Sequence, residues 1–400
     1  MRFLARSRFR PAILLAAAAV ALVSAAAVSG GAGAANSTNV ATTAKAAVLM
    51  DADTGAILFQ HNADELLPPA SITKLMTIEM VFQAMKAARV KPDDQYTMSV
   101  HAWKTGGAPS RTSSMFVPVN TTATVDELLQ GMIVQSANDA AIAVAENMAG
   151  SEDAFAKRMM IEARRIGMTK SVFKNPSGLY DPEHVMTARE IGMLALYIIK
   201  EHPDQYSRFG QKEFQYHKYK FRNRNSLLFE DIGVDGMKTG SLKEAGYNLV
   251  ASATQNGKRL IAVVMGLASE QQCAAEAKRL LQWGFSGFAP FKLFEAGETV
   301  GKARVWGGDS FYVPLTGAGP VMIMLPRVPA NPRLQAVITY EGPLKPPIKK
   351  GDQVARLRVT SQTNTVNDVP LYAAQDVNPG GLMRRGLDSL AHLALSWVAL

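Results

Sequence analysis

The sequence predicts an α+β fold followed by a small all-β domain. The stretch AAVLMDADTGAILFQHNAD predicts two short strands about the turn Asp51–Gly55. From there to about Phe288 the pattern is mostly helical, but two apolar runs of strand length return on either side of Asn256 and Gly257. Strands, then many helices, then strands are typical of an α+β domain, so we expect the last hairpin to pair with the first in one sheet.

A length of 400 residues favours more than one folding unit. We assign residues 1–34 to a signal peptide, 35–290 to the α+β domain, 291–377 to a β-sandwich-like domain and 378–400 to an amphipathic helix. The hydrophobic pattern changes near residue 290 from helical spacing to short alternating runs such as LQAVITY and QVARLRVT. In the second run, Ala355, Leu357 and Val359 alternate with Arg356 and Arg358, as expected for a strand with one buried face.

The first 34 residues have the composition of a secretory signal. Four arginines lie among the first ten residues, an alanine-rich apolar run covers residues 11–28, and Ala32–Ala34 forms an A-x-A cleavage site. The alternative is an uncleaved membrane anchor, for which the apolar run is short. Cleavage lowers the formal net charge from +9 to +5, which does not indicate a nucleic-acid-binding protein.

A serine and a lysine three residues apart are the first candidates for chemistry. Ser71 and Lys74 lie in SITKLMTIEMVFQAMKAA, where apolar residues recur at helical spacing. Residues three apart on a helix face the same side, so the hydroxyl and the amine would lie within hydrogen-bonding distance. Such a pair predicts an activated nucleophile. The same pattern at Ser171–Lys174 is followed by Asn175 and Pro176, which disfavour a helix there, and we expect no catalytic role for it.

The tripeptide Lys-Thr-Gly also occurs twice. The copy at Lys238–Gly240 precedes YNLVASATQNGKRLIAVVMGL, which predicts two strands joined by a type I′ turn, and we expect it on a strand at the sheet edge. The copy at Lys104–Gly106 enters a glycine-rich, hydroxyl-rich stretch and is expected in a loop. A third string, Ser136–Asn138, lies inside the helical stretch Val125–Met148, where Ser and Asn favour a break.

The remaining chemistry-bearing residues are sparse. Cys273 is the single cysteine, which excludes an internal disulfide, and we expect it buried in a helix as a packed thiol. The six histidines show no metal-binding spacing, so a structural or catalytic metal is not expected.

The last segment, LMRRGLDSLAHLALSWVAL, predicts an amphipathic helix. Met383, Leu387, Leu390, Ala394 and Trp397 fall on one face. An apolar face ending in tryptophan suits the surface of a membrane, and no spanning helix is expected. The alternative is a helix that docks on its own protein.

These motifs, in this order between a signal peptide and a β domain with an amphipathic tail, resemble the low-molecular-mass penicillin-binding proteins of the D-alanyl-D-alanine carboxypeptidase family. The resemblance covers nearly the whole chain and includes DGMKTG with AGYNLVASAT, NRNSLL and FKNPSGL. It implies a penicillin-binding, β-lactamase-like domain with helices on both sides of an antiparallel sheet. It also implies removal of the terminal D-alanine from peptidoglycan stem pentapeptides through an acyl-serine intermediate.

By the same resemblance, β-lactam antibiotics would be covalent inhibitors, and the protein would be exported to the periplasm. There it would be peripheral on the outer face of the cytoplasmic membrane, held through its C-terminal helix. Ser71 would be the nucleophile, Lys74 the base and Ser136 a proton relay, while backbone N–H groups of Ser71 and Ser241 would form the oxyanion hole. The implied substrate-binding residues are Asn138, Lys238, Thr239, Gly240, Ser241 and Arg224.

One departure from the family concerns the substrate carboxylate. Related sequences commonly carry an arginine near the start of the helix after the sheet hairpin, but this chain has Gln271, Gln272 and Cys273 there. Carboxylate recognition would then fall to Thr239, Ser241 or Arg224. Arg224 could also be a structural hydrogen-bonding residue.

Three other functions are alternatives to the carboxypeptidase. A D,D-endopeptidase of peptidoglycan cross-links would use the same residues. A β-lactamase would need a carboxylate that drives deacylation, and no ExxLN-like stretch is present. The third is an inactive wall-binding scaffold, which the intact motifs disfavour.

Overall fold

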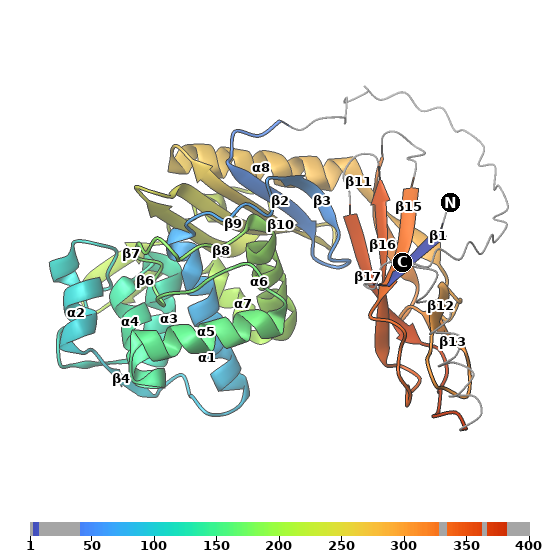
Figure 1. Ribbon diagram of the computed structural model, residues 1–400. Helices are drawn as coiled ribbons and strands as arrows, with labels where there is room; N and C mark the ends of the chain where they lie inside the picture. The colour runs from blue at the N-terminus through green and yellow to red at the C-terminus, as the bar shows by residue number, and fades with distance from the viewer. Residues whose placement is uncertain (1–2, 8–40, 328–333, 362–365, 382–400) are drawn as a thin grey trace, which may run out of the picture. The chain divides into compact units, whose positions relative to one another are not determined.

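The computed structural model describes residues 3–7, 41–327, 334–361 and 366–381, and shows two compact units (Figure 1). The larger unit comprises Ala41–Asp53 and Phe59–Ser286. Of the described residues, the smaller unit contains 3–7, Thr54–Leu58, 287–327, 334–361 and 366–381.

An antiparallel sheet forms the centre of the larger unit. Its strand order is β2-β10-β9-β8, with the Phe59–His61 part of β3 next to β2. The predicted pairing of the last hairpin with the first is confirmed, because Val263 of β10 lies opposite Val48 of β2. β8 is therefore the edge strand of this part of the sheet. The strands are β2 (Ala46–Asp51), β3 (Ile57–His61), β8 (Val234–Leu242), β9 (Gly246–Gln255) and β10 (Lys258–Leu267).

The loop of the β9–β10 hairpin is formed by Asn256 and Gly257, the two residues predicted to form a type I′ turn. Gln255 pairs with Lys258, which leaves Asn256 and Gly257 as the loop, and both have positive φ, 51° and 75°. A type I′ turn requires positive φ at both central residues, so the predicted turn is confirmed.

Helices cover both faces of the sheet, as the resemblance implied. Along β2, Leu49 faces α8 (Glu270–Gly287), where a side chain at Gly284 would lie 2.6 Å from Leu49. Its neighbours Val48 and Met50 face α6 (Ala188–Glu201) instead. Successive side chains of a strand point to opposite faces, and all six residues of β2 are buried for this reason.

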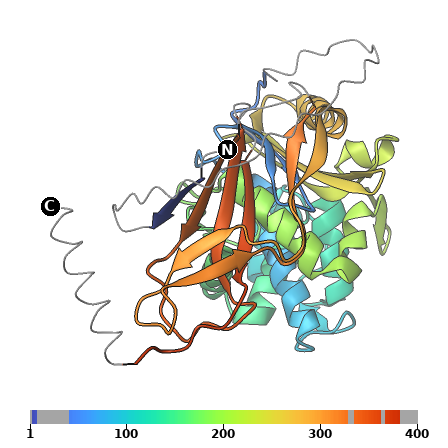
Figure 2. The same cartoon turned by 90° about the vertical axis from the view of Figure 1, so that its right-hand side faces the viewer.

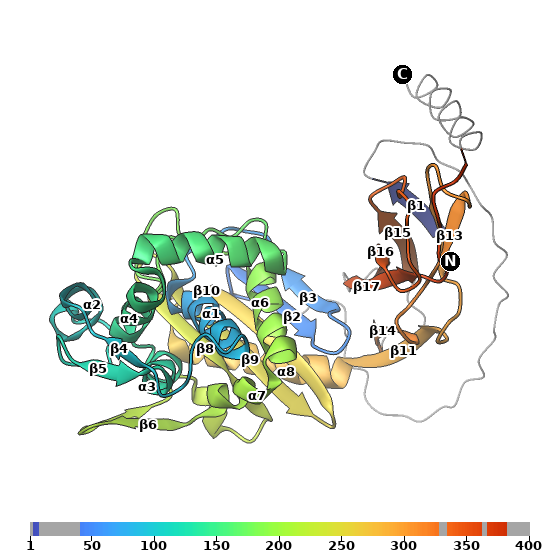
Figure 3. The same ribbon diagram turned by 90° about the horizontal axis from the view of Figure 1, so that it is seen from below.

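The remaining helices of the larger unit lie on the α6 side of the sheet (Figure 3). The first of them, α1, starts directly after a 3₁₀ turn, η1 (Ala70–Thr73), and buries Leu75, Ile78 and Phe82. The other helices are α2 (Val100–Gly106), α3 (Val125–Gln130), α4 (Asn138–Ala149), α5 (Glu152–Ile166) and the short α7 (Pro203–Tyr206); α1 spans Lys74–Lys86. Two small hairpins, β4 (Gln95–Thr97) with β5 (Thr122–Thr124) and β6 (Glu213–Tyr216) with β7 (Tyr219–Arg222), complete the unit.

Two predictions on this helical side had different outcomes. The predicted break near Ser136 is confirmed, because α3 continues into a π-helical segment at 131–135 and α4 begins at Asn138. The loop predicted for Lys104–Gly106 is wrong. These residues form the last turn of α2, and the missing side chain of Gly106 lets α2 approach α4, because a Cβ there would lie 2.5 Å from the Asp139 nitrogen.

The smaller unit is built from antiparallel strands (Figure 2, orange and red). The predicted run LQAVITY is β15, and in β16 Leu357 and Val359 are buried whereas Arg356 and Arg358 are exposed and contact Asp368. Its strands are β11 (Phe288–Phe294), β12 (Gly301–Arg304), β13 (Tyr312–Thr316), β14 (Val321–Pro326), β15 (Leu334–Tyr340), β16 (Gln353–Ser361) and β17 (Val366–Ala373). The backbone of β1 (Phe3–Ser7) runs parallel to β15.

The predicted C-terminal amphipathic helix lies outside the described residues from Leu382 onward. Within the ranges described above, no helix combines the length and the apolar character needed to cross a bilayer.

Candidate active site

Three sequence motifs, Ser71–Lys74, Ser136–Asn138 and Lys238–Gly240, meet at the edge strand β8. The Lys74 amine lies 3.0 Å from the Ser71 hydroxyl and 2.6 Å from the side-chain oxygen of Asn138. The Lys238 amine lies 2.9 Å from the Ser136 hydroxyl. The structure therefore brings together the three motifs that the sequence separated by more than 60 residues each.

Ser71 owes its position to the tight contact between η1 and β8. A side chain at Gly240 would lie 2.9 Å from the Pro69 carbonyl oxygen and 3.1 Å from the Ser71 nitrogen, so only glycine lets the strand come this close. From the neighbouring strand, the Asn248 amide donates to the carbonyl oxygens of Pro68 and Pro69 at 3.2 and 3.1 Å. These contacts fix the turn that carries Ser71 against the sheet.

Ser136 lies at the helix break in a left-handed conformation, with φ of 61°. This conformation ends the π-helical segment and lets α4 start at Asn138 in a new direction. The break thus places the Ser136 hydroxyl within reach of Lys238 on β8.

Both lysines are buried, and burial lowers the pKa of each. Lys74 has no exposed surface, and its pKa is held well below its ordinary 10.5 first by desolvation and then by the positive charges of Lys238 and Arg224. Desolvation, with a smaller effect of Arg224, lowers the pKa of Lys238 to about 7. The site can therefore hold a neutral amine near neutral pH.

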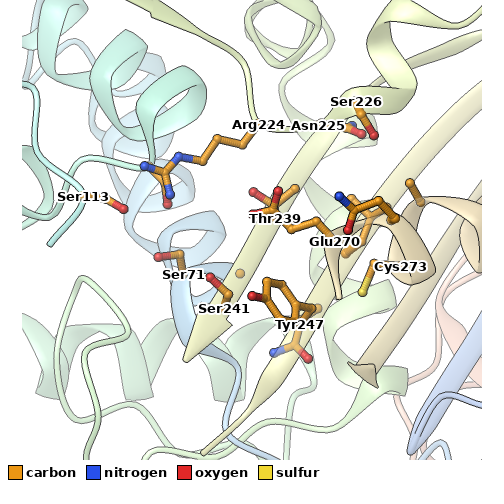
Figure 4. Close-up of a pocket in the computed structure, with 16 residues that line it drawn as sticks. Ser71, Ser113, Arg224, Asn225, Ser226, Thr239, Ser241, Tyr247, Glu270 and Cys273 are labelled. Atoms are coloured by element: carbon orange, nitrogen blue, oxygen red, sulfur yellow. The ribbon is translucent and has the colours of Figure 1, made fainter. Parts of the chain in front are cut away.

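A pocket opens between β8, η1 and the start of α8 (Figure 4). Of the predicted site residues, Ser71, Ser136, Thr239, Gly240, Ser241 and Arg224 line it. Lys74, Asn138 and Lys238 are almost fully buried and are not among the lining residues. The prediction that Asn138 contacts substrate stays a prediction, because its side chain here binds Lys74 and, at 2.9 Å, the Thr112 hydroxyl.

Arg224 is exposed and its side chain extends toward Ser113 (Figure 4). The helix that follows β10 contributes Glu270, Gln271 and Cys273 to the wall on the other side. Cys273 is buried in α8, as predicted, and burial raises the pKa of its thiol to about 12. Arg224 is therefore the one arginine among the pocket-lining residues of the described chain.

The second Ser-x-x-Lys motif lacks the serine–lysine contact of the first. Ser171 is completely buried and its hydroxyl donates to Glu190 at 2.5 Å. The Lys174 amine pairs with Glu183 at 2.6 Å instead of approaching Ser171. No helix joins these two residues.

Sequence reasoning missed several residues that build the site. The Ser177 carbonyl accepts a hydrogen bond from Lys74 at 2.6 Å, and the buried Asp139 accepts from the Ser114 hydroxyl at 2.7 Å and from the Phe116 nitrogen at 3.1 Å. Asp139 thereby holds the segment that carries Ser113 into the pocket. The sequence shows a turn at residues 175–178 (NPSG) and a carboxylate, Asp139, directly after Asn138. Neither feature reveals which residues it contacts in the fold.

The comparison with known families agrees with this geometry. Residues 33–269 match the family described as D-alanyl-D-alanine carboxypeptidase, Peptidase S11. Residues 288–379 match the C-terminal domain of penicillin-binding protein 5. The chain belongs to the D-alanyl-D-alanine carboxypeptidase family.

Individual relatives of this family member cover most of its length. D-alanyl-D-alanine carboxypeptidase DacC of Escherichia coli K12 is 38% identical over 348 residues, 86% of this chain and 87% of the relative. The crystal structure of penicillin-binding protein 5 from Haemophilus influenzae superposes with a TM-score of 0.70 at 36% identity, covering 85% and 99% of the two chains. Penicillin-binding protein D2 of Listeria monocytogenes, solved in an ampicillin-bound form, has a TM-score of 0.54 at 28% identity and covers 62% and 99%.

Proposed function

We propose that Ser71 is the nucleophile with which this serine D-alanyl-D-alanine carboxypeptidase removes the terminal D-alanine of peptidoglycan stem pentapeptides. The observation that carries the proposal is the 3.0 Å contact between the Ser71 hydroxyl and the buried Lys74 amine. A hydroxyl becomes a competent nucleophile only when a base lies within hydrogen-bonding distance. Lys74 meets the distance, and its lowered pKa allows the neutral form.

The partners of Lys74 favour proton transfer from Ser71. Two of its three contacts, Asn138 Oδ1 and the Ser177 carbonyl oxygen, can only accept hydrogen bonds. The Ser71 hydroxyl is the one contact that can also donate. When Lys74 is neutral, its two hydrogens bind the two acceptors and its lone pair is left for the Ser71 proton.

The reaction proceeds in two steps. Ser71 Oγ bonds to the carbonyl carbon of the penultimate D-alanine and its proton passes to Lys74. The C–N bond then breaks, and a proton returns through Ser136 to the leaving nitrogen of D-alanine. In the second step, water adds to the ester, its proton passes to Lys74, and the Ser71 oxygen leaves with a proton. No cofactor takes part.

The edge strand β8 binds the substrate backbone as an added strand, because an edge strand presents unpaired N–H and C=O groups. The Ser71 and Ser241 N–H groups bind the oxyanion, and each such donor contributes about 3 kcal/mol to transition-state stabilisation. Lys238, Thr239 and Arg224 attract the terminal carboxylate. Arg224 takes this part because Gln271, Gln272 and Cys273 occupy the region where sequences of the resembling family commonly carry an arginine.

A β-lactam enters the same pocket and acylates Ser71 when its ring amide opens. The ampicillin-bound relative supports this use of the fold. We also propose that the chain is exported and stays peripheral on the outer face of the cytoplasmic membrane through residues 382–400. The N-terminal signal pattern and the amphipathic C-terminal sequence support this location.

Release of free D-alanine from diacetyl-Lys-D-Ala-D-Ala tests the proposal. The wild type is expected to release D-alanine and to be labelled by a fluorescent penicillin, and Ser71→Ala is expected to lose both. Ser171→Ala is the matched control: it loses a buried hydrogen bond to Glu190, worth about 1 kcal/mol of stability, but keeps both activities. Labelling at Ser171, or cleavage of only a cross-linked dimer peptide, contradicts the assignment.

A further inference from the structure

The hairpin of β6 and β7 carries a concentration of positive charge beside the pocket. Between residues 212 and 224 there are five basic residues and one acidic residue, Glu213. Lys212, Lys218, Lys220 and Arg222 are all exposed. In the part of the chain that the structure describes, none of these four forms an ion pair with a carboxylate. The hairpin segment therefore has an excess of four positive charges (five basic residues less one acidic), although Glu213 lies opposite Arg222 in the strand register.

The opposite face of the hairpin is aromatic and anchored. Phe214 and Phe221 stack with centroids 6.0 Å apart, and Tyr219 lies 4.8 Å from the ring of Phe116. The Phe116 N–H donates to Asp139, and Ser113, three residues before Phe116, lines the pocket. Strand alternation places Lys220 and Arg222 on the side opposite Phe214 and Phe221. Lys212 precedes β6, and Lys218 lies in the turn with its amine 5.5 Å from the centroid of the Tyr219 ring.

Two of the cations contact the same aromatic ring. The Arg222 guanidinium lies 4.0 Å from the centroid of the Phe229 ring, and the Lys212 amine lies 5.8 Å from the same centroid. Sharing one ring keeps two like charges in the same small area, where an anion would reduce their repulsion.

The cationic face is continuous in sequence with the pocket wall. After Arg222, Asn223 is buried and donates to the Gln211 carbonyl oxygen at 2.8 Å, and the next residue is Arg224, which lines the pocket. If one end of an anionic polymer bound in the pocket, the carboxylates further along the polymer would be attracted by the positive charges of the hairpin.

We propose that the cationic face of the β6–β7 hairpin, which carries Lys220 and Arg222 with Lys212 and Lys218 at its two ends, is a binding surface for a polymer with acidic peptides attached, here the carboxylate-bearing stem peptides of peptidoglycan. The surface captures the polymer outside the pocket and raises the rate at which stem-peptide ends reach Ser71. The inference rests on the proposed function, because it names where the polymeric substrate of that site binds.

The test compares polymer with short peptide in the full mature chain. The hairpin variant is Lys212→Gln/Lys220→Gln/Arg222→Gln, and the controls are Glu213→Gln in the same hairpin and Lys157→Gln on α5, which lies at the opposite edge of the larger unit from β6 (Figure 3). D-alanine release is measured on pentapeptide-rich sacculi and on diacetyl-Lys-D-Ala-D-Ala, at about 20 mM and about 500 mM salt. Cosedimentation with sacculi reports binding directly.

The hairpin variant is expected to lose kcat/KM on sacculi by on the order of tenfold at low salt, with the loss disappearing at high salt. Its activity on the short peptide is expected to match the wild type. Glu213→Gln is expected to increase sacculus binding, and Lys157→Gln to leave it unchanged. Equal sacculus binding by the hairpin variant and the wild type, or weaker binding only to vesicles of anionic lipid, overturns the inference. Absence of D-alanine release from the short peptide by the wild type would instead refute the proposed function.

Discussion

The Lys238 amine donates to the Ser136 hydroxyl at 2.9 Å, which joins the edge strand to the helix break across 102 residues of sequence. Both side chains are buried, and desolvation lowers the pKa of Lys238 to about 7. The Lys74 amine, also buried, contacts Ser71. The site thus contains two amines that must be in different protonation states: in the proposed mechanism Lys74 is neutral and Lys238 is protonated.

A bell-shaped dependence of kcat/KM on pH is expected from this pair. Activity increases as Lys74 loses its proton, and decreases above about pH 7 as Lys238 loses its charge. Lys238→Arg, which stays charged, is expected to move the alkaline decrease to higher pH even if its maximum rate is lower. A steady-state pH profile on the short peptide measures this. An unchanged alkaline limb in Lys238→Arg would show that another group titrates.

The burial of Lys238 also predicts how stability depends on pH. The pKa is about 7 in the folded chain and 10.5 ordinarily, so between these values the unfolded chain binds more protons than the folded one. The free energy of unfolding should therefore rise with pH across this window. Lys238→Met is expected to flatten the rise and to stabilise the protein at pH 6 by on the order of 1 kcal/mol, while abolishing activity. Urea unfolding at pH 6 and pH 9 tests both parts, and a destabilised variant at pH 6 would contradict them.

Gly240→Ala is expected to lower the rate of acylation by on the order of a hundredfold. The new methyl group would lie 2.9 Å from the Pro69 carbonyl oxygen and must push β8 away from the turn that carries Ser71. Stopped-flow labelling with a fluorescent penicillin measures the step. Gly319→Ala, where the added methyl group meets nothing within 4 Å, is the control and should acylate like the wild type. Normal acylation in Gly240→Ala would mean that the strand can shift freely.

Arg224→Gln is expected to raise KM for a D-Ala-D-Ala peptide by about tenfold with little change in kcat, since it removes a charge that binds the substrate carboxylate in the ground state and the transition state alike. Gln271→Arg, on the opposite wall of the same pocket, should restore part of the affinity. Initial-rate kinetics on the single and double variants separate the two effects. A fall in kcat with unchanged KM would assign Arg224 to the chemical step.

Removal of residues 382–400 is expected to release the protein from membranes and to spare hydrolysis of the short peptide. An amphipathic helix binds the bilayer interface through its apolar face, and the pocket residues lie far earlier in the chain. Sedimentation with lipid vesicles, with the full mature chain as the control, measures the change. Equal sedimentation of the two proteins would show that the segment docks on the protein.

Much of the larger unit followed from local sequence signals. The turn at Asn256 and Gly257 and the break at Ser136 were predictable because each depends on the preference of a few adjacent residues for one backbone conformation. The proximity of Ser71 and Lys74 followed in the same way from helical spacing.

Other parts depend on contacts that no local pattern encodes. Asn138 could be placed at the break, but its hydrogen bond to Lys74 depends on how α4 packs against α1. The Ser177 carbonyl and the Asn248 amide reach the site only because distant segments fold against η1. The helix at Lys104–Gly106 was missed because its glycines suggested a loop, whereas Gly106 serves the close packing of α2 on α4.

The thiol of Cys273 in the pocket wall adds little sensitivity to oxidants. A thiol with a pKa of about 12 holds almost no thiolate at neutral pH, and peroxides and disulfides react with the thiolate. With a single cysteine in the sequence, the fold also needs no oxidative pairing to mature. The hydroxyl chemistry of this site should therefore persist through shifts of redox poise that would silence a thiol peptidase.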